Sequence, residues 1–146
     1  MNWFEELIAY ISSQLGLSLQ TDKGSICKLV IEESFHMQLE HESSYERLLI
    51  ASFLAELPPG KFREDVLKAG LKANHPLSRF GQFAYSEKNN ALAYFVYLSD
   101  KESFEHIFDL LLVFIETAKT WKRAIERGEL HILHQDSGSS LPPPMM

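Results

Sequence analysis

Six histidines are the residues of this chain that most readily suggest metal chemistry. His36 and His41 flank a predicted loop, and His131 and His134 lie three residues apart beyond the last predicted helix. A structural zinc site needs four well-spaced ligands, usually including several cysteines. The chain has a single cysteine, so we interpret the histidines as surface residues and predict neither a metal nor another cofactor.

The other reactive side chains also lack the company that catalysis requires. Cys27 lies in an apolar stretch without an activating neighbour, because Lys28 points to the opposite face of a strand. The acidic pairs Glu5-Glu6, Glu32-Glu33 and Glu64-Asp65 are adjacent in sequence, and adjacent side chains do not face each other. No phosphate-binding glycine loop, GxSxG or HExxH motif occurs. We therefore predict no enzyme; a small-molecule enzyme without a recognisable motif is the alternative.

Composition restricts the class of protein further. With 146 residues, 45% hydrophobic and 23% charged, the chain is long enough for one globular domain. Its net charge of -6 argues against non-specific binding to nucleic acid or anionic membranes, both of which favour a basic face. The N-terminus lacks the positive charge of a signal peptide, and the longest apolar run, Leu110 to Ile115, is too short to span a bilayer. We expect a cytoplasmic protein.

The first predicted helix runs from Asn2 to Leu15. Asn2 and Glu5 have the spacing of a capping box, and Gly16 is a typical residue just beyond a helix end. Two further helices are expected, from Lys61 to Asn74 after the turn Pro58-Pro59-Gly60 and from about Phe104 to Arg127. Residues Ser99 to Glu102 are predicted to cap the last one.

Five stretches have the composition of strands. They are Ile26–Ile31, Phe35–Leu39, Leu48–Leu54, Phe80–Tyr85 and Ala91–Leu98. Leu48–Leu54 also fits a short helix, but two preceding strands need a third partner for stability.

These elements predict an α+β fold. The order is helix, three strands, helix, two strands, helix, with a twisted, mostly antiparallel five-stranded sheet and three helices. We expect residues 1–134 to form one domain and residues 135–146 to be a disordered tail rich in Pro and Ser.

Large apolar side chains exceed what a domain of this size readily covers. Most should belong to the core, but together they predict an association surface. Self-association through the middle helix and capture of an extended peptide at an open sheet edge are the two candidate uses.

Several segments, in this order and spacing, resemble the class I type III secretion chaperones of the Tir-chaperone (CesT/SycE-like) family. The resemblance covers about Asn2 to Arg127. The segments that carry it are Leu15-Gly16-Leu17, Asp22-Lys23-Gly24-Ser25-Ile26-Cys27-Lys28-Leu29, Leu54-Ala55-Glu56-Leu57-Pro58, Leu71-Lys72-Ala73-Asn74 and Phe114-Ile115-Glu116-Thr117-Ala118-Lys119-Thr120-Trp121-Lys122.

The resemblance implies a non-enzymatic, dimeric bacterial chaperone of the cytosol. Such a protein binds the N-terminal chaperone-binding segment of a secreted effector in extended form and keeps it soluble and competent for secretion. It takes no part in nucleic-acid binding or membrane insertion. The alternative function is a stand-alone regulatory adaptor of the YbjN-like kind, which binds another protein outside secretion.

The resemblance also implies two sets of site residues. The effector groove would be lined by Trp3, Phe4, Leu7, Ile8, Leu29, Ile31, Phe35 and Met37. The dimer contact would be formed by Val66, Leu67, Gly70, Leu71, Phe80, Phe83 and Tyr85. The family often has paired glycines after the middle helix, whereas here Gly81 stands alone. A heterodimer with a related chaperone is therefore an alternative to a homodimer.

Overall fold

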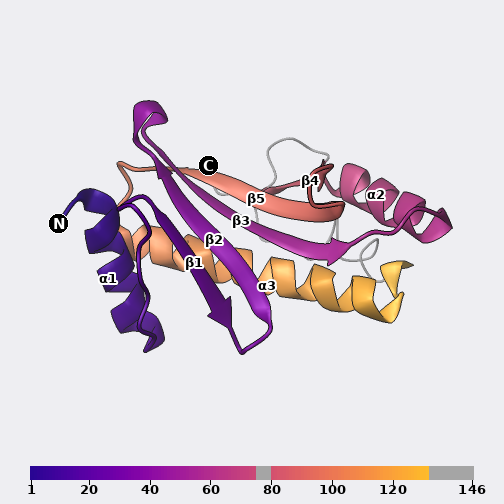
Figure 1. The fold of residues 1–146 in the computed structure, drawn as a ribbon, viewed down its shortest axis with the longest axis horizontal. Helices are drawn as coiled ribbons and strands as arrows, with labels where there is room; N and C mark the ends of the chain where they lie inside the picture. The colour runs from indigo at the N-terminus through magenta and orange to yellow at the C-terminus, as the bar shows by residue number, and fades with distance from the viewer. Residues whose placement is uncertain (75–79, 132–146) are drawn as a thin grey trace. The chain divides into compact units, whose positions relative to one another are not determined.

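A computed structural model describes residues 1–74 and 80–131 and confirms the predicted order of elements (Figure 1). The elements are α1 (Trp3–Leu15), β1 (Ile26–Ile31), β2 (Phe35–Glu42), the short 3-10 helix η1 (Ser43–Tyr45), β3 (Arg47–Glu56), α2 (Lys61–Ala73), β4 (Gln82–Ser86), β5 (Ala91–Ser99) and α3 (Phe104–Arg127). The predictions for His134 and for the tail from residue 135 lie outside the described residues.

The five strands form one sheet in the order β1-β2-β3-β5-β4. The neighbours β1 and β2, β2 and β3, and β4 and β5 pair antiparallel. At one end of the β3–β5 pair the amide of Leu57 donates to the carbonyl of Asn90, and at the other the amide of Asp100 donates to that of Glu46. This crossed order of partners makes β3 and β5 antiparallel as well, so the predicted α+β fold with an antiparallel sheet is confirmed.

The chain divides into two compact units. Unit 1 comprises residues 1–52 and 97–114, and unit 2 comprises residues 53–96 and 115–146. The strands β3 and β5 and the helix α3 contribute residues to both.

The core of unit 1 forms between α1, the inner face of the β1–β2–β3 strands and the first turns of α3. Asn2 and Glu5 make the predicted capping box, and Gly16 ends α1 with a φ of 67°. The strands alternate apolar and polar residues, and the helices repeat apolar residues every three to four positions. Both patterns direct apolar side chains into the core of unit 1. The buried members are Phe4, Leu7, Ile8, Ile11, Cys27, Leu29, Phe35, Met37, Leu39, Leu48, Ile50, Leu98, Ile107, Leu110, Leu111 and Phe114.

The core of unit 2 centres on Phe83 of β4. Its ring lies 4.6 Å from that of Tyr94 and 4.0 Å from that of Trp121, measured between centroids. The helix α2 packs beside β4 in this unit (Figure 1). Gly81 precedes β4 with a φ of 79°, and a Cβ there would meet the Tyr94 hydroxyl at 2.3 Å. Only glycine fits this position.

Several predicted boundaries were wrong; β3, for example, spans Arg47–Glu56 and not Leu48–Leu54. β2 continues through Glu42, because its polar end still pairs with β3 at Leu48 and Arg47. α3 is capped by Ser103, whose hydroxyl accepts from the amide of His106 at 3.1 Å, and Ser99 belongs to β5. β4 begins at Gln82, since the positive φ of Gly81 interrupts the extended backbone. Within the described residues, no helix combines the length and apolar character needed to cross a membrane.

Candidate binding surfaces

The strand β1 lies at one edge of the sheet, and its backbone shows which groups face outward. The amide of His41 donates to the carbonyl of Ser25 at 2.8 Å, so these two residues form a hydrogen-bonded pair. Hydrogen-bonded pairs recur at every second residue of an antiparallel ladder. Residues Cys27, Leu29 and Ile31 therefore bond to β2. The backbone groups of Ile26, Lys28 and Val30 point to the open edge.

One of these three residues is already occupied. The amide of Asp22 donates to the carbonyl of Ile26 at 2.7 Å, and the amide of Ile26 donates back to Asp22 at 3.2 Å. The amide and carbonyl groups of Lys28 and Val30 have no such partner in the described part of the chain. An unpaired strand edge of this kind is a template for an added strand.

The side chains of β1 alternate across the sheet. Cys27 and Leu29 are buried, and burial raises the pKa of the Cys27 thiol. Lys28 is exposed on the opposite face, as predicted, and Val30 beside it is 41% exposed. The open edge therefore combines free backbone groups with a cationic and an aliphatic side chain.

Most of the residues predicted to line an effector groove lie in the core of unit 1. Six of them are at most 4% exposed: Phe4, Leu7, Ile8, Leu29, Phe35 and Met37. Trp3 and Ile31 are half-buried and keep accessible surface. A groove floor and a core use the same apolar periodicity, so the sequence pattern cannot separate the two. The exposed Val30 was missed, although its place in the alternation opposite Leu29 was a usable signal.

A polar and aromatic cluster fixes the N-terminal end of α1. His41 Nε2 donates to Asp100 Oδ2 at 3.0 Å, and the imidazole lies 4.6 Å from the Trp3 ring. The Trp3 ring also contacts Phe104 at 5.9 Å. The hydrogen bond from His41, together with the nearby Lys101 ammonium, lowers the pKa of Asp100. The His41 imidazole is thus held by a carboxylate of the same unit.

In unit 2, α2 and β4 border a surface hollow of about 120 Å³. Seven residues line it: Leu67, Gly70, Leu71, Phe83, Ala84, Tyr85 and Leu92. Five of these belong to the predicted dimer contact, which the structure therefore brings together. The sequence analysis missed Ala84 and Leu92. Leu92 pairs with Tyr85 across the β4–β5 ladder, and this pairing follows from the strand register, which the sequence alone does not give.

Within this surface the predicted residues differ in accessibility. Leu71 is 70% exposed, whereas Val66 is fully buried and Phe80 is half-buried outside the hollow. A Cβ at Gly70 would lie 3.3 Å from Phe83 Cβ, so α2 and β4 approach closely at this glycine. The bare Cα of Gly70 thus serves packing within the chain.

A second network holds Tyr85, one of the residues that line the hollow. Arg63 donates to the Tyr85 hydroxyl, which donates to Asn90 Oδ1. The guanidinium also lies 4.7 Å from the centre of the Tyr85 ring. Tyr85 is therefore held in one orientation before any partner arrives.

The edge of β4 is bonded at Phe83, as the edge of β1 is bonded at Ile26. Asn74 follows α2, and its side-chain amide donates to the carbonyl of Phe83 at 2.8 Å. Its Oδ1 accepts from the amide of Phe83 at 2.7 Å. One side chain thus reproduces the pair of bonds that a neighbouring strand would make.

No cluster of three or more potential metal ligands occurs among residues 1–74 and 80–131. The sequence matches the family model of the Tir chaperone protein (CesT) family over residues 6–122. The chain belongs to this family. The match confirms the resemblance seen in the sequence, and no curated protein matches the chain.

Solved structures with the same fold agree with membership of the CesT family. A chain of the HopA1–SchA chaperone–effector complex aligns with a TM-score of 0.67 at 18% identity, over 84% of this chain and 94% of its own length. A chain of the ExsC–ExsE complex aligns with a TM-score of 0.67 at 21% identity, covering 86% and 97%. The structure of the Yersinia pestis type III secretion chaperone SycH with a fragment of YscM2 gives 0.59 at 17% identity, covering 82% and 99%.

Proposed function

We propose that this CesT-family protein is a non-enzymatic, cytoplasmic type III secretion chaperone that binds the N-terminal segment of a secreted effector. Family membership and the similarity to a chain of a chaperone–effector complex support this function. The observation that carries it is the open edge of β1 at Lys28 and Val30.

The mechanism is strand addition. An extended effector segment would donate to and accept from the backbone of Lys28 and Val30, in the manner of peptide capture at a sheet edge. A segment held as an extra strand cannot form its own compact structure. Apolar side chains of the segment would lie beside Val30 and Ile31, whose exposed surface adds hydrophobic burial to the backbone bonds.

The buried residues of the predicted groove would act from beneath this edge. Leu29 and Met37 face each other across the β1–β2 ladder, and α1 packs over that face with Phe4, Leu7 and Ile8. We propose that they hold the edge strand straight and in register, while Trp3 and Ile31 contact the effector directly.

We also propose that the hollow between α2 and β4 meets a second chaperone chain, identical or related. A two-fold interface pairs one patch with itself, so an exposed side chain must find a recess on the same patch. Leu71 is such a side chain, and the hollow beside it is apolar.

The strand-addition step is tested by Val30→Pro. Proline removes the outward amide and is tolerated on edge strands, so the chain should fold while losing effector binding by about tenfold or more. Val30→Thr keeps the amide and the β-branched shape, and should bind within about twofold of the wild type. Circular dichroism checks folding, and isothermal titration measures binding.

The titration needs an identified effector. The chaperone would be purified from its own bacterium, and the partner named by mass spectrometry would be rebuilt as a purified N-terminal fragment. A one-effector complex that Val30→Pro breaks supports the proposal. A partner that is not secreted would favour the adaptor alternative, and unchanged binding by Val30→Pro would move the effector to another surface.

The dimer contact is tested by Leu71→Asp in sedimentation experiments. A carboxylate at this exposed position costs the folded chain little but would be buried unpaired in the interface, so dimers should dissociate. Phe62→Asp is the matched control, since Phe62 is 42% exposed on the same helix but does not line the hollow. Equal behaviour of the two variants would contradict the interface.

A further inference from the structure

Unit 1 has a second apolar surface, formed by α1 and the first turns of α3. The ring of Tyr10 lies 5.9 Å from that of Phe104 and 6.3 Å from that of Phe108. Leu112 follows one turn later and is 41% exposed. We call these four residues the helical stripe. Since Phe104, Phe108 and Leu112 are spaced by four, they run along one side of α3.

The helical stripe is not required to complete the core. The core side of α3 in unit 1 consists of Ile107, Leu110, Leu111 and Phe114, which are at most 6% exposed. Tyr10, Phe104 and Phe108 are only half-buried beside them. Contiguous apolar surface that a fold leaves exposed often marks an interaction site.

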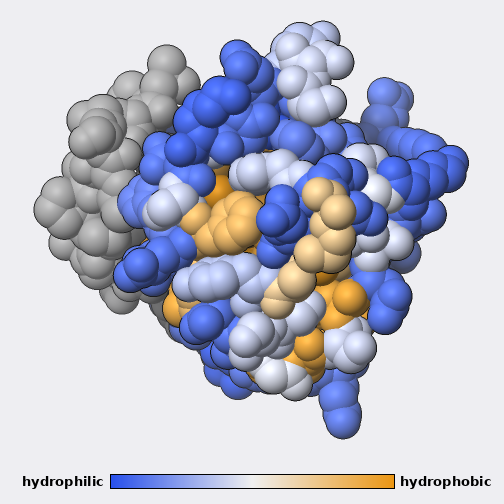
Figure 2. Space-filling view, turned by 90° about the vertical axis from the view of Figure 1, so that its left-hand side faces the viewer, coloured by the Kyte–Doolittle hydropathy of each residue, from blue (hydrophilic) through white to orange (hydrophobic). Residues whose placement is uncertain are grey.

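The Asp, Glu, Lys and Arg side chains of α1 and of residues 104–114 are all acidic. Glu6, Glu105 and Asp109 are exposed on the same two helices and make no ion pair within the described part of the chain. Neither α1 nor residues 104–114 contain a lysine or arginine. Figure 2 shows the side of the molecule that carries α1, where apolar patches are bordered by hydrophilic side chains.

Local helix electrostatics explain only part of this charge. Glu6 and Glu105 lie in the first turns of their helices, where carboxylates favour the helix dipole. Asp109 lies a turn beyond that and gains little from it. The acidic border therefore extends past the positions that helix stability accounts for.

We infer that the helical stripe is a docking surface for a basic amphipathic helix of a partner protein. Two to three turns of such a helix would place apolar side chains against Phe104, Phe108 and Leu112, and its lysines or arginines beside Glu105 and Asp109. This surface offers side chains, whereas the β1 edge offers backbone groups. The inference stands on the geometry of unit 1 and does not depend on effector binding.

The apolar part is tested with a fluorescent 14-residue amphipathic peptide that carries leucines at helical spacing and lysines on either side. Leu112→Ala should weaken binding about fivefold or more, measured by anisotropy at low salt. Phe62→Ala is the matched control, because Phe62 is 42% exposed but lies on α2 in unit 2. It should bind within about twofold of the wild type.

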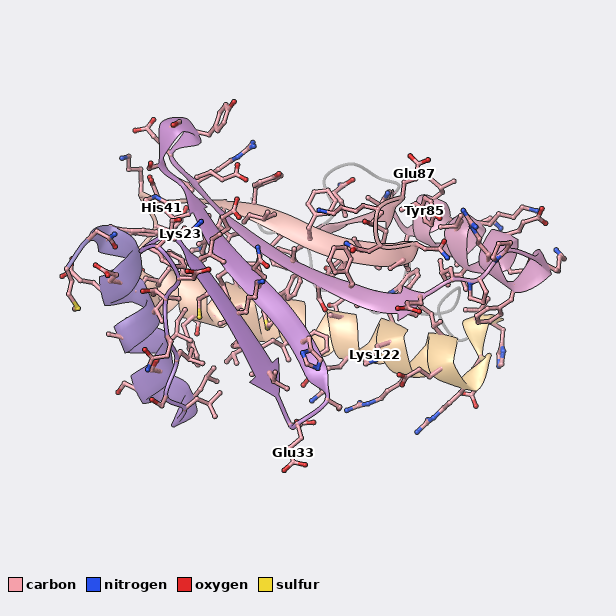
Figure 3. The ribbon with its side chains drawn as sticks, viewed as in Figure 1. Lys23, Glu33, His41, Tyr85, Glu87 and Lys122 are labelled. Carbon is pink, nitrogen blue, oxygen red and sulfur yellow. The ribbon has the colours of Figure 1, made fainter. Side chains whose placement is uncertain are left out.

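The charged part is tested with Asp109→Asn against Glu33→Gln. Each removes one exposed carboxylate, but Glu33 lies at the tip of the β1–β2 turn, at the opposite end of the hairpin from His41 (Figure 3). Asp109→Asn should weaken binding about threefold at low salt, and the difference should fade at high salt. Glu33→Gln should change the affinity for the peptide by less than about 1.5-fold at low salt.

Three outcomes would overturn the inference. Equal weakening by both charge variants would show a general electrostatic attraction to an acidic protein. In an NMR titration with the same peptide, amide chemical-shift changes that map to β1 in place of α1 and α3 would show that the peptide binds at a different site. Equal binding of the peptide with glutamates in place of its lysines would exclude charge complementarity. Wild-type circular dichroism of each variant keeps misfolding apart from these results.

Discussion

The two units of this chaperone-family protein differ sharply in charge. Unit 1 has twelve acidic and four basic side chains, a formal net charge of -8, whereas unit 2 has eight acidic and ten basic ones, a net charge of +2. The overall value of -6 hides this difference. The surfaces proposed for foreign partners lie in the acidic unit, and the surface proposed for a second chain lies in the nearly neutral one. Like-charge repulsion would oppose the reverse arrangement.

The edge strands of the two units also differ in how their outward backbone groups are bonded. In unit 1 the β1 edge leaves Lys28 and Val30 open, while in unit 2 Asn74 closes the β4 edge at Phe83. An edge that recruits a strand must stay open, and an edge beside a side-chain interface is safer closed. The fold therefore covers the β4 edge at Phe83, and it leaves the backbone of Lys28 and Val30 on the β1 edge unbonded within the described residues.

Unit 2 should be the more sensitive of the two to a glycine substitution. Gly81→Ala should lower the free energy of unfolding by about 3 kcal/mol or more, because a Cβ there collides with Tyr94 and the backbone has a positive φ. Urea unfolding measures the change. Gly16→Ala in unit 1 is the control: its φ is also positive but nothing lies within 4 Å, so the expected loss is about 1 kcal/mol. Equal losses of unfolding free energy in the two variants would mean that the Tyr94 side chain moves aside to accommodate the new Cβ.

Opening the closed edge should cost less. Asn74→Ala removes two hydrogen bonds to Phe83 and should lower the free energy of unfolding by about 2 kcal/mol. It should also make the protein prone to concentration-dependent aggregation, followed by light scattering. Asn89→Ala, on the exposed loop after β4, should change neither quantity. An Asn74→Ala protein with wild-type stability would show that water replaces the lost bonds at no cost.

Acid should act on unit 1 through Asp100. Folding lowers the pKa of this carboxyl, so its stabilising effect is complete above the ordinary value of about 4 and is lost as the pH falls below it. Asp100→Asn should reduce stability at pH 7 and flatten the decline between pH 5 and 3, seen in urea unfolding at each pH. A decline as steep as that of the wild type would contradict this role of Asp100.

The lone thiol of unit 1 should be protected from chemical modification by its burial. Cys27 is fully buried and burial raises its pKa, so the native protein should react with a disulfide reagent at least about 100-fold more slowly than the unfolded chain. Reaction at the unfolded rate would show that β1 opens readily, and would weaken the picture of a rigid edge strand.

The fold was predictable from sequence because its signals are local. Asn2 with Glu5, Gly16 and the alternation in Phe35–Leu39 each specify backbone geometry within a few residues. The site residues were less predictable. Phe4 and Leu71 both occupy apolar helix positions, yet one is fully buried and the other is 70% exposed. Phe4 is buried because α1 packs on the sheet, whereas Leu71 is exposed because α2 packs beside the edge strand β4. Both arrangements depend on contacts between distant parts of the chain, which the sequence pattern does not show.

The bonds between Asp22 and Ile26 have a consequence for length and register. They occupy the first outward position of β1, and the turn at Glu32 and Glu33 ends the strand after Ile31. Within the described part of the chain, two outward-facing residues remain open. At about 3.3 Å per residue they can pair with roughly three residues of an incoming strand. So short a ladder selects one alignment of that chain but contributes only a few kcal/mol. The rest of the binding energy must come from surfaces beyond the sheet.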